Sequence, residues 1–318
     1  MMNVSDKIKY VGVDDLDIDL FESQYVVPEG MSYNSYVILD EKTAVMDTVD
    51  ARKTDEWINN VKVALGGKNL DYIVCLHMEP DHAGSMMKAM ETFPTAKVVG
   101  NAKTFTYMAQ FFDVNLEGRK VEVKDGESLS LGEHNLTFVC APMVHWPEVM
   151  VAYESSEKVL FAADAFGKFG AISKYDGDWA CEARRYYFNI CGKYGVQVQS
   201  LLKKAAALDI KTIAPLHGPV LKENLGYYLD LYNTWSSYGV ESEGVLVAFA
   251  SIHGNTRKAA EKIASILEKQ GAKKVVVSDL SRDDEAEVIE DAFRYGRMII
   301  AAPTYDGGLF PPMESFLS

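Results

Sequence analysis

The chain has 318 residues, of which 48% are hydrophobic and 11% aromatic, enough to build the cores of two globular domains. Its formal net charge of −14 would repel nucleic acid and anionic membranes, so neither is an expected partner. The N-terminus shows no basic segment followed by an apolar run, and no stretch is long and apolar enough to cross a bilayer, which predicts a cytoplasmic protein.

Apolar runs bounded by Gly, Asp, Asn and Pro predict strands in the first part of the chain. Between residues 24 and 165 these runs are 33–39, 43–49, 71–77, 96–100, 136–142, 149–155 and 159–164. Helical spacing is found among them at 53–64, 84–92 and 102–112, and again at 180–207, before a last strand within 212–219. This alternation predicts an α/β sandwich.

A change in composition marks a domain boundary near residues 236–244, SSYGVESEG, where small and charged residues follow no apolar period. We therefore predict one domain over 1–240 and a second over 244–318. In the second, strands at 245–250, 274–279 and 298–303 alternate with helices at 255–270 and 284–294, which is typical of a parallel, doubly wound sheet. Three strands and the stub 310–318 fall short of the five strands of a flavodoxin-like order, so we expect an incomplete sheet.

The four cysteines form no C-x-x-C pair. Cys75 and Cys140 lie in apolar runs where a buried, reduced thiol is expected. Cys181 and Cys191 lie outside such runs, and a reducing compartment fits all of them.

The segment LHMEPDHAGS (76–85) carries two imidazoles and two carboxylates within six positions, His77, Glu79, Asp81 and His82. Side chains alternate in an extended chain, and Pro80 keeps Glu79 extended, so positions 77, 79 and 81 are expected to converge. Packing these groups together is electrostatically costly without a cation. The segment therefore predicts a metal site.

Three more candidate ligands, His145, Asp164 and His217, each end a strand-like run, the edge where α/β sheets collect functional groups. Alone, His217 or Asp164 would be read as an ordinary structural residue or cap. Beside the cluster at 77–82 they become candidate ligands. His134, in LGEHNL, is instead expected to face solvent in a turn.

The pattern H-x-E-x-D-H, followed by His145, Asp164 and a later HGP, resembles the diiron domain of flavodiiron proteins, also called A-type flavoproteins. Similar segments are PEGMSYNSYVI (28–38), HWPEVM (145–150), ARRYYFNICGKY (183–194) and APLHGPV (214–220). The resemblance implies a metallo-β-lactamase-like αββα sandwich followed by a partial flavodoxin-like doubly wound parallel sheet. It also implies that one iron takes His77, Glu79 and His145, that the other takes Asp81, His82 and His217, and that Asp164 bridges them. His82 matches a ligand that water displaces in some members.

A carboxylate at position 79 favours iron, because zinc hydrolases of the same fold carry a second histidine there. Hard, anionic oxygen ligands suit iron and stabilise its higher oxidation state. A dizinc hydrolase of the metallo-β-lactamase fold remains the alternative enzyme. A redox-inert module with an occupied but idle site is the alternative outside catalysis.

The second domain carries two loops that match flavodoxin loops for FMN. The first, at a predicted helix N-terminus, offers hydroxyl and amide groups to a phosphate and comprises Ser251, Ile252, His253, Gly254, Asn255 and Thr256. The second lines the flavin ring in the family and comprises Pro303, Thr304, Tyr305, Asp306 and Gly307. Plain surface turns are the alternative reading. We expect the remaining strands and a third flavin loop to lie beyond Ser318, which leaves open whether this chain alone holds FMN.

The resemblance implies an oxidoreductase that reduces nitric oxide to nitrous oxide, dioxygen to water, or both, with electrons passed from FMN to a non-haem diiron centre. It implies a head-to-tail homodimer or a dimer of dimers, with Trp146 either at that junction or in the core. A rubredoxin-like protein or another electron donor is implied as well. The sequence identifies neither the preferred gas nor the donor.

Overall fold

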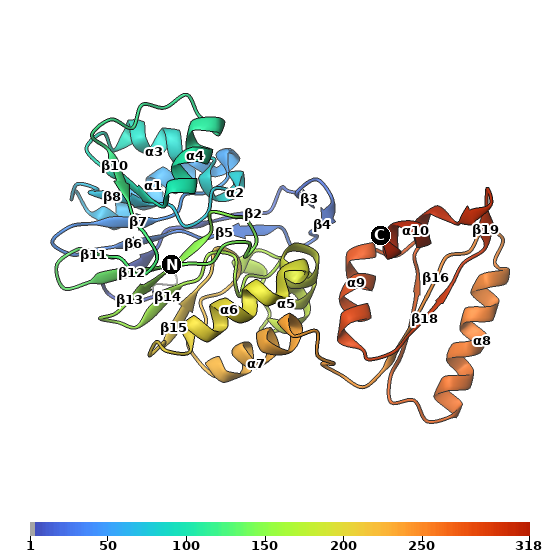
Figure 1. The fold of residues 1–318 in the computed structure, drawn as a ribbon. Coiled ribbons are helices and arrows are strands. Elements are labelled where there is room, and N and C mark those ends of the chain that lie inside the picture. The colour runs from blue at the N-terminus through green and yellow to red at the C-terminus, as the bar shows by residue number, and fades with distance from the viewer. Residues whose placement is uncertain (1–3) are drawn as a thin grey trace. The chain divides into compact units, whose positions relative to one another are not determined.

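The computed structural model describes residues 4–318 and divides them into two compact units. Unit 1 comprises the described residues up to Ala183 together with Val196–Leu229, and unit 2 comprises Arg184–Gly195 and Asp230–Ser318. Figure 1 colours the chain from blue at its N-terminus to red at its C-terminus. Within residues 4–318, no helix is both long and apolar enough to cross a membrane.

Two sheets form the centre of unit 1 (Figure 1). The first sheet has the order β1 (Ile8–Tyr10), β6 (Tyr36–Ile38), β7 (Ala44–Met46), β8 (Tyr72–Val74), β9 (Lys97–Gly100) and β10 (Lys120–Glu122). Its strands from β7 to β10 are parallel to one another. The second sheet has the order β11 (Ser128–Ser130), β12 (Asn135–Cys140), β13 (Met150–Glu154), β14 (Val159–Phe161) and β15 (Thr212–Ala214). Only its β14–β15 pair is parallel.

Helices cover the outer faces of these sheets. Those on the first sheet are α1 (Thr54–Leu65), α3 (Met86–Thr92) and α4 (Ala102–Phe111) (Figure 1). On the second, α6 (Gly195–Ala205) is anchored where Lys204 Nζ donates to the carbonyl oxygen of Cys140 at the end of β12. Two ribbons complete the unit, one pairing β2 (Val13–Asp15) with β5 (Met31–Tyr33) and the other pairing β3 (Leu20–Phe21) with β4 (Tyr25–Val26). The expected αββα sandwich is confirmed.

Helix α1 shows how the sequence specifies these elements. Trp57, Ile58, Val61 and Leu65 repeat at helical spacing, and all four are buried against the sheet. Two acidic residues in its first turn suit the positive end of the helix dipole. Gly66 ends the helix in the left-handed conformation, at φ 58°, where its N–H donates to carbonyl oxygens of the last turn.

Unit 2 contains a parallel sheet in the order β17 (Val275–Asp279), β16 (Val245–Phe249) and β18 (Met298–Ala301). Helix α8 (Asn255–Lys269) follows β16, and α9 (Glu285–Arg294) follows β17. The central strand β16 is buried throughout. Val245, Val247 and Phe249 pack with α8 residues, whereas Leu246 and Ala248 pack into a cluster that includes Val288 of α9. A strand apolar on both faces is the signature of a covered parallel sheet.

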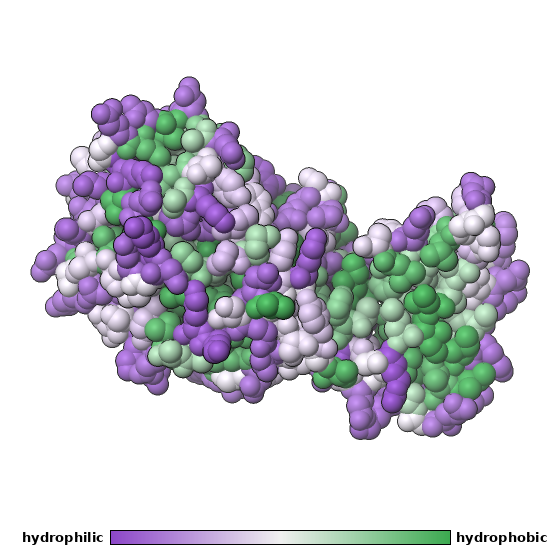
Figure 2. Space-filling view, in the orientation of Figure 1, coloured by the Kyte–Doolittle hydropathy of each residue, from purple (hydrophilic) through white to green (hydrophobic). Residues whose placement is uncertain are grey.

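The last residues of the chain form a short hairpin, β19 (Thr304–Tyr305) with β20 (Gly308–Leu309), and then helix α10 (Pro311–Leu317). Residues 4–318 contribute three strands to the parallel sheet of unit 2, as the sequence predicts. Strand β18 lies at its edge and leaves Met298 43% and Ile300 48% exposed. Figure 2 shows apolar residues gathered on this surface, in the region where Figure 1 labels β18.

The segment with helical spacing over 180–207 is helical but is interrupted. Helix α5 (Ala180–Tyr186) continues into a π-helical turn over Tyr187–Cys191 and a 3-10 turn over Gly192–Tyr194 before α6 begins. Glycine is a poor helix former and lies at both Gly192 and Gly195. At Gly195 a Cβ would fall 2.4 Å from the carbonyl oxygen of Ser236, so close backbone contact requires glycine there.

Candidate metal centre

The loop after β8 brings its four polar residues into the interior of unit 1. His77, Asp81 and His82 are buried, and Glu79 is partly buried. Glu79 is extended, at φ −59° and ψ 139°, but Pro80 then opens a single helical turn, α2 (Pro80–Ala83), since proline is well accommodated in the first turn of a helix. The chain therefore turns before Asp81, and positions 77, 79 and 81 do not converge on one point as alternation predicts.

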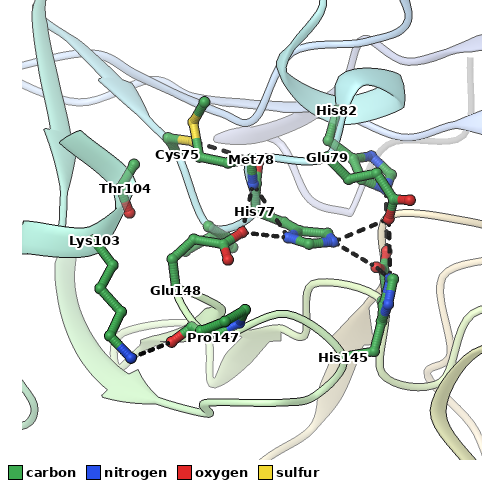
Figure 3. Close-up of polar contacts among 12 residues, drawn as sticks. Cys75, His77, Met78, Glu79, His82, Lys103, Thr104, His145, Pro147 and Glu148 are labelled. Atoms are coloured by element: carbon green, nitrogen blue, oxygen red, sulfur yellow. Dashed lines mark hydrogen bonds and ion pairs between the residues drawn. The ribbon is translucent and has the colours of Figure 1, made fainter. Parts of the chain in front are cut away.

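The first group of candidate ligands consists of His77, Glu79, His145 and Asp164, whose ligand atoms lie within 4.8 Å of one another. Glu79 Oε2 lies 3.2 Å from His77 Nε2 and 2.9 Å from His145 Nε2. Asp164 Oδ2 lies 3.1 Å and 3.2 Å from the same two nitrogens. Figure 3 shows the His77 and His145 rings turned toward this shared point.

The second group consists of Asp81, His82 and His217. Asp81 Oδ2 lies 3.3 Å from His82 Nε2 and 3.2 Å from His217 Nε2. The other oxygen of Asp164, Oδ1, lies 3.0 Å from His82 Nε2 and 3.8 Å from His217 Nε2. Asp164 therefore presents one oxygen to each group, and all seven residues singled out in the sequence are brought together.

Buried atoms without hydrogen-bond partners indicate that these groups suit cations. Among the described residues they include both oxygens of Asp81, both oxygens of Asp164 and both ring nitrogens of His82. A buried polar atom without a partner costs about 1–3 kcal/mol, and coordination to a metal would satisfy these atoms. Imidazole nitrogens mixed with carboxylate oxygens form a donor set that suits iron.

The carboxylates of the centre favour protonation of neighbouring histidines when no cation is bound. Burial alone would lower the pKa of His77, but Asp164, Glu148 and Glu79 together raise it well above its usual value. Burial opposes the ionised form of Asp164 too, yet His77 and His82 hold its pKa well below the usual range. The pKa of His145 is raised to about 9, mainly by Asp164 and Glu79 against the effect of burial. Metal ions and protons would thus compete for these side chains.

Glu148 fixes the orientation of His77. Its Oε1 lies 2.7 Å from His77 Nδ1 and accepts the backbone N–H of Met78 at 2.9 Å (Figure 3). With Nδ1 donating to this carboxylate, Nε2 of His77 is left to face the candidate ligands. Sequence reasoning missed Glu148, because a single carboxylate three residues after His145 in HWPEVM carries no pattern of its own.

Asp47 supports the same loop from β7. Its Oδ1 accepts the backbone N–H groups of Leu76 at 2.7 Å and of His77 at 3.2 Å. Burial raises the pKa of Asp47 to about 7, although His82 and these hydrogen bonds oppose the rise. This residue was also missed, because its partners lie about 30 positions away in sequence.

His217 is held by a set of hydrogen bonds between residues 32–36 and residues 215–218. Its Nδ1 lies 2.6 Å from the carbonyl oxygen of Ser32, which leaves Nε2 facing Asp81. Ser32 Oγ accepts the N–H of Gly218 at 2.7 Å. Asn34 Nδ2 donates to the carbonyl oxygens of Pro215 and Gly218, each at 2.8 Å. We call this set the 32–36 clamp.

The centre borders a surface cavity of about 320 Å³, lined in part by Glu79, Asp81 and the β3–β4 hairpin. Glu22 lies in that hairpin with a positive φ of 49°. Burial and the neighbouring Glu79 raise the pKa of Glu22 to about 7. The Phe21 ring packs edge-on against His217, with ring centroids 5.5 Å apart. A small molecule could therefore reach the side of the centre that Glu79 and Asp81 form.

Trp146 covers another side of the centre. Its ring packs edge-on against His77, with centroids 5.4 Å apart, and against Tyr107 of α4, with centroids 6.1 Å apart. Trp146 is partly buried and Phe111, whose ring is 6.4 Å away, is exposed. Trp146 thus joins an aromatic cluster that reaches the surface of unit 1.

His134 lies apart from the centre, and the expectation that it faces solvent is wrong. It is only 3% exposed, with Nδ1 2.9 Å from Asp40 and Nε2 3.2 Å from Glu157. Gly132, at φ 131°, lets the turn close onto Asp40. The thiols partly follow expectation, since the described cysteines form no disulfide and Cys75 is buried, but Cys140 is only partly buried.

The two candidate flavin loops follow neighbouring strands of unit 2, β16 and β18. Residues 251–256 run into α8, and Gly254, at φ 82°, donates its N–H to Ser251 Oγ at 3.0 Å. Residues 303–307 comprise β19 and the turn that leads to β20. Tyr305 is exposed and Gly307 has φ 77°. Because parallel strands end at the same edge of a sheet, both loops lie at one edge.

Comparison with known proteins adds independent observations. The profile of the ODP family of β-lactamases matches residues 31–218. A nitric oxide reductase of Moorella thermoacetica is 31% identical over 99% of this chain and 80% of its own length. Among solved structures, the flavodiiron protein of Giardia intestinalis superposes with a TM-score of 0.93 at 26% identity, over 99% of this chain and 78% of that one. Rubredoxin oxygen:oxidoreductase of Desulfovibrio gigas gives a TM-score of 0.91 at 26% identity, over 99% and 80%. The first curated relatives are covered over 66% to 81% of their lengths.

Proposed function

This chain belongs to the flavodiiron protein family, with an ODP-type β-lactamase domain and a flavodoxin-like parallel sheet, and from that premise we propose that it reduces nitric oxide, dioxygen or both. The single observation that carries the proposal is the position of Asp164. Its two oxygens face two separate groups of imidazole and carboxylate ligands, an arrangement suited to a pair of adjacent metal ions. Relatives named for nitric oxide reduction and for oxygen reduction support both substrates.

In the proposed centre, His77, Glu79 and His145 would hold one iron ion. Asp81, His82 and His217 would hold the other, with Asp164 shared between them. A pair of iron ions held by these residues would supply electrons for the reduction of a diatomic gas. The chain's own contribution is to orient the donors, since Glu148 and the Ser32 carbonyl direct Nε2 of His77 and His217 inward, and to limit water with Trp146 and Phe21.

We assign residues 1–240 to the diiron domain and 244–318 to the flavodoxin-like domain. Flavodiiron proteins pair their iron centre with FMN, and loops 251–256 and 303–307 would bind its phosphate and ring. The position of both loops at the carboxyl edge of parallel strands supports this assignment.

Further proposals concern the electron donor, the oligomeric state and the cellular location. A rubredoxin-like donor or another electron carrier would supply electrons, in keeping with the name of the Desulfovibrio gigas relative. A head-to-tail homodimer or a dimer of dimers would bring the FMN of one chain to the iron of another. The lack of disulfides among the described cysteines agrees with a cytoplasmic location.

The alternative, a dizinc hydrolase, is disfavoured by Glu79. Its carboxylate contacts both imidazoles of the first group, where a zinc hydrolase of this fold would carry a histidine. No observation favours an idle binding module over the enzyme.

The test is metal analysis followed by gas consumption. Protein from iron-replete cultures should carry two iron ions per chain and, when chemically reduced without air, should consume nitric oxide or dioxygen. Asp164→Ala should lose both properties, whereas His134→Gln, which changes a buried imidazole outside the centre, should keep them. Zinc in place of iron, or iron-loaded protein that consumes neither gas, would contradict the proposal.

A further inference from the structure

Unit 1 contains a second cavity, of about 460 Å³, that is distinct from the one beside the metal centre. One wall is formed by the β4–β5 loop and the other by the segment that follows β14. The lining includes Val27, Pro28, Glu29, Lys168, Phe169 and Gly170. Cavities of this size accommodate small organic molecules, and none of the seven candidate metal ligands lines this one.

Lys168 is the buried charged group of this cavity, with only 6% of its surface exposed. Two glycines with positive φ hold it in place. At Gly218, φ +78°, a Cβ would fall 2.6 Å from Lys168 Cγ, so the lysine stem packs directly on this backbone. At Gly170, φ +100°, a Cβ would fall 3.6 Å from Lys168 Nζ and 3.7 Å from Glu29 Cβ. Gly170 therefore leaves open the space between the ammonium group and Glu29.

The ammonium group of Lys168 has no anionic partner among residues 4–318, where every carboxylate oxygen lies beyond 4.0 Å of its Nζ. Lys168 Nζ lies 5.1 Å from the centroid of the Tyr175 ring. Burial lowers the pKa of Lys168, although nearby acids oppose the effect. The Lys168 side chain is largely buried, but its Nζ remains accessible from the cavity. A bound carboxylate there would supply a close counter-charge.

The rim of the cavity carries mostly negative charge, opposite to that of Lys168. Glu29, Asp176 and Asp178 line it and are exposed, and Lys174 is the exposed cation among them. Glu182 also lines the cavity and is partly buried. A simple anion would be repelled by these carboxylates, and a simple cation would be repelled by Lys168. A molecule that carries both charges can satisfy both parts of the cavity.

We propose that this cavity binds a small zwitterion of the α-amino acid class. The ligand carboxylate would pair with Lys168, its ammonium group would face Glu29, and its apolar side chain would lie against Val27 and Phe169. Charge-assisted hydrogen bonds of this kind are the strong ones in a partly dry site. This inference goes beyond the proposed function, and its test does not depend on metal content.

Calorimetric titration of the full chain with L-leucine tests the proposal. N-acetyl-L-leucine, which keeps only the negative charge, and L-leucinamide, which keeps only the positive one, serve as matched probes. L-leucine should bind with one-to-one stoichiometry, and each derivative should bind at least about tenfold more weakly, because each loses one charged contact. Lys168→Met should weaken L-leucine binding by a similar factor, and Lys62→Met, at an exposed position of α1 outside the cavity, should change it less than about twofold.

Circular dichroism and the melting temperature establish whether Lys168→Met folds. If it does not, Lys168→Arg and Glu29→Gln take its place, with Lys168→Arg expected to retain binding better than Glu29→Gln. Lack of saturable heat from L-leucine up to about 10 mM would overturn the proposal. Equal binding of N-acetyl-L-leucine would indicate a plain anion site, and tighter binding of L-leucinamide a cation site; either result rejects the zwitterion.

Discussion

Replacing Glu148 by glutamine keeps the size of the side chain but removes its charge. In the structure this buried carboxylate lies 2.7 Å from His77 Nδ1, so the neutral amide should leave the imidazole less basic and less firmly oriented. Loss of such an outer-shell partner typically weakens metal binding by roughly 10–100-fold, which corresponds to about 1.4–2.7 kcal/mol. We expect Glu148→Gln to reduce iron affinity by this factor while the fold is retained.

Anaerobic titration of metal-free protein with ferrous iron against a competing chelator measures this affinity. Glu154→Gln is the matched control, because Glu154 is also fully buried on β13 but accepts hydrogen bonds from the backbone of Ser156 and Glu157. Unchanged iron affinity in Glu148→Gln, or an equal loss in Glu154→Gln, would refute the assigned role of Glu148.

Three further changes test other parts of the molecule. His145→Ala should lower iron content to about one ion per chain or fewer, because it removes an imidazole from the first group; normal iron content by elemental analysis would exclude His145 as a ligand. His134→Gln should cost about 1–3 kcal/mol near pH 6 in denaturant unfolding and less at high pH. Asp40 and Glu157 raise the pKa of His134, so its stabilisation is present below the usual histidine pKa and is lost as pH rises through the raised value; a pH-independent loss would contradict this. Glu290→Gln should raise the melting temperature at pH 9 relative to wild type more than at pH 4. Burial raises the pKa of Glu290 from 4.5 to about 8 despite Arg184, so this glutamate lowers stability increasingly as pH rises from about 4.5 to about 8, and the loss persists above that range; an equal change at both pH values would count against it.

The sequence predicts those features that depend on local pattern. Apolar runs bounded by turn residues indicate the strands, and the density of imidazoles and carboxylates at 77–82 indicates the metal site. It predicts poorly what depends on contacts made elsewhere in the fold. Pro80 begins a helical turn that sends Asp81 to the second group. The sequence pattern alone does not show that this turn forms. His134 is buried because Asp40, 94 positions away, closes over it. Glu148 resembles any polar residue beside a strand until its distance to His77 is known.

The 32–36 clamp has a consequence for the order in which the protein matures. Its bonds join residues separated by 179 to 186 positions in sequence, and contacts of such long range are among the last to become available during synthesis. His217 cannot take its position until the segment around Pro215 has left the ribosome and docked on Ser32 and Asn34. A nascent chain that has displayed only His77 to Asp164 therefore offers an unfinished set of candidate ligands, and binding of iron to the proposed centre would have to await a nearly completed unit 1.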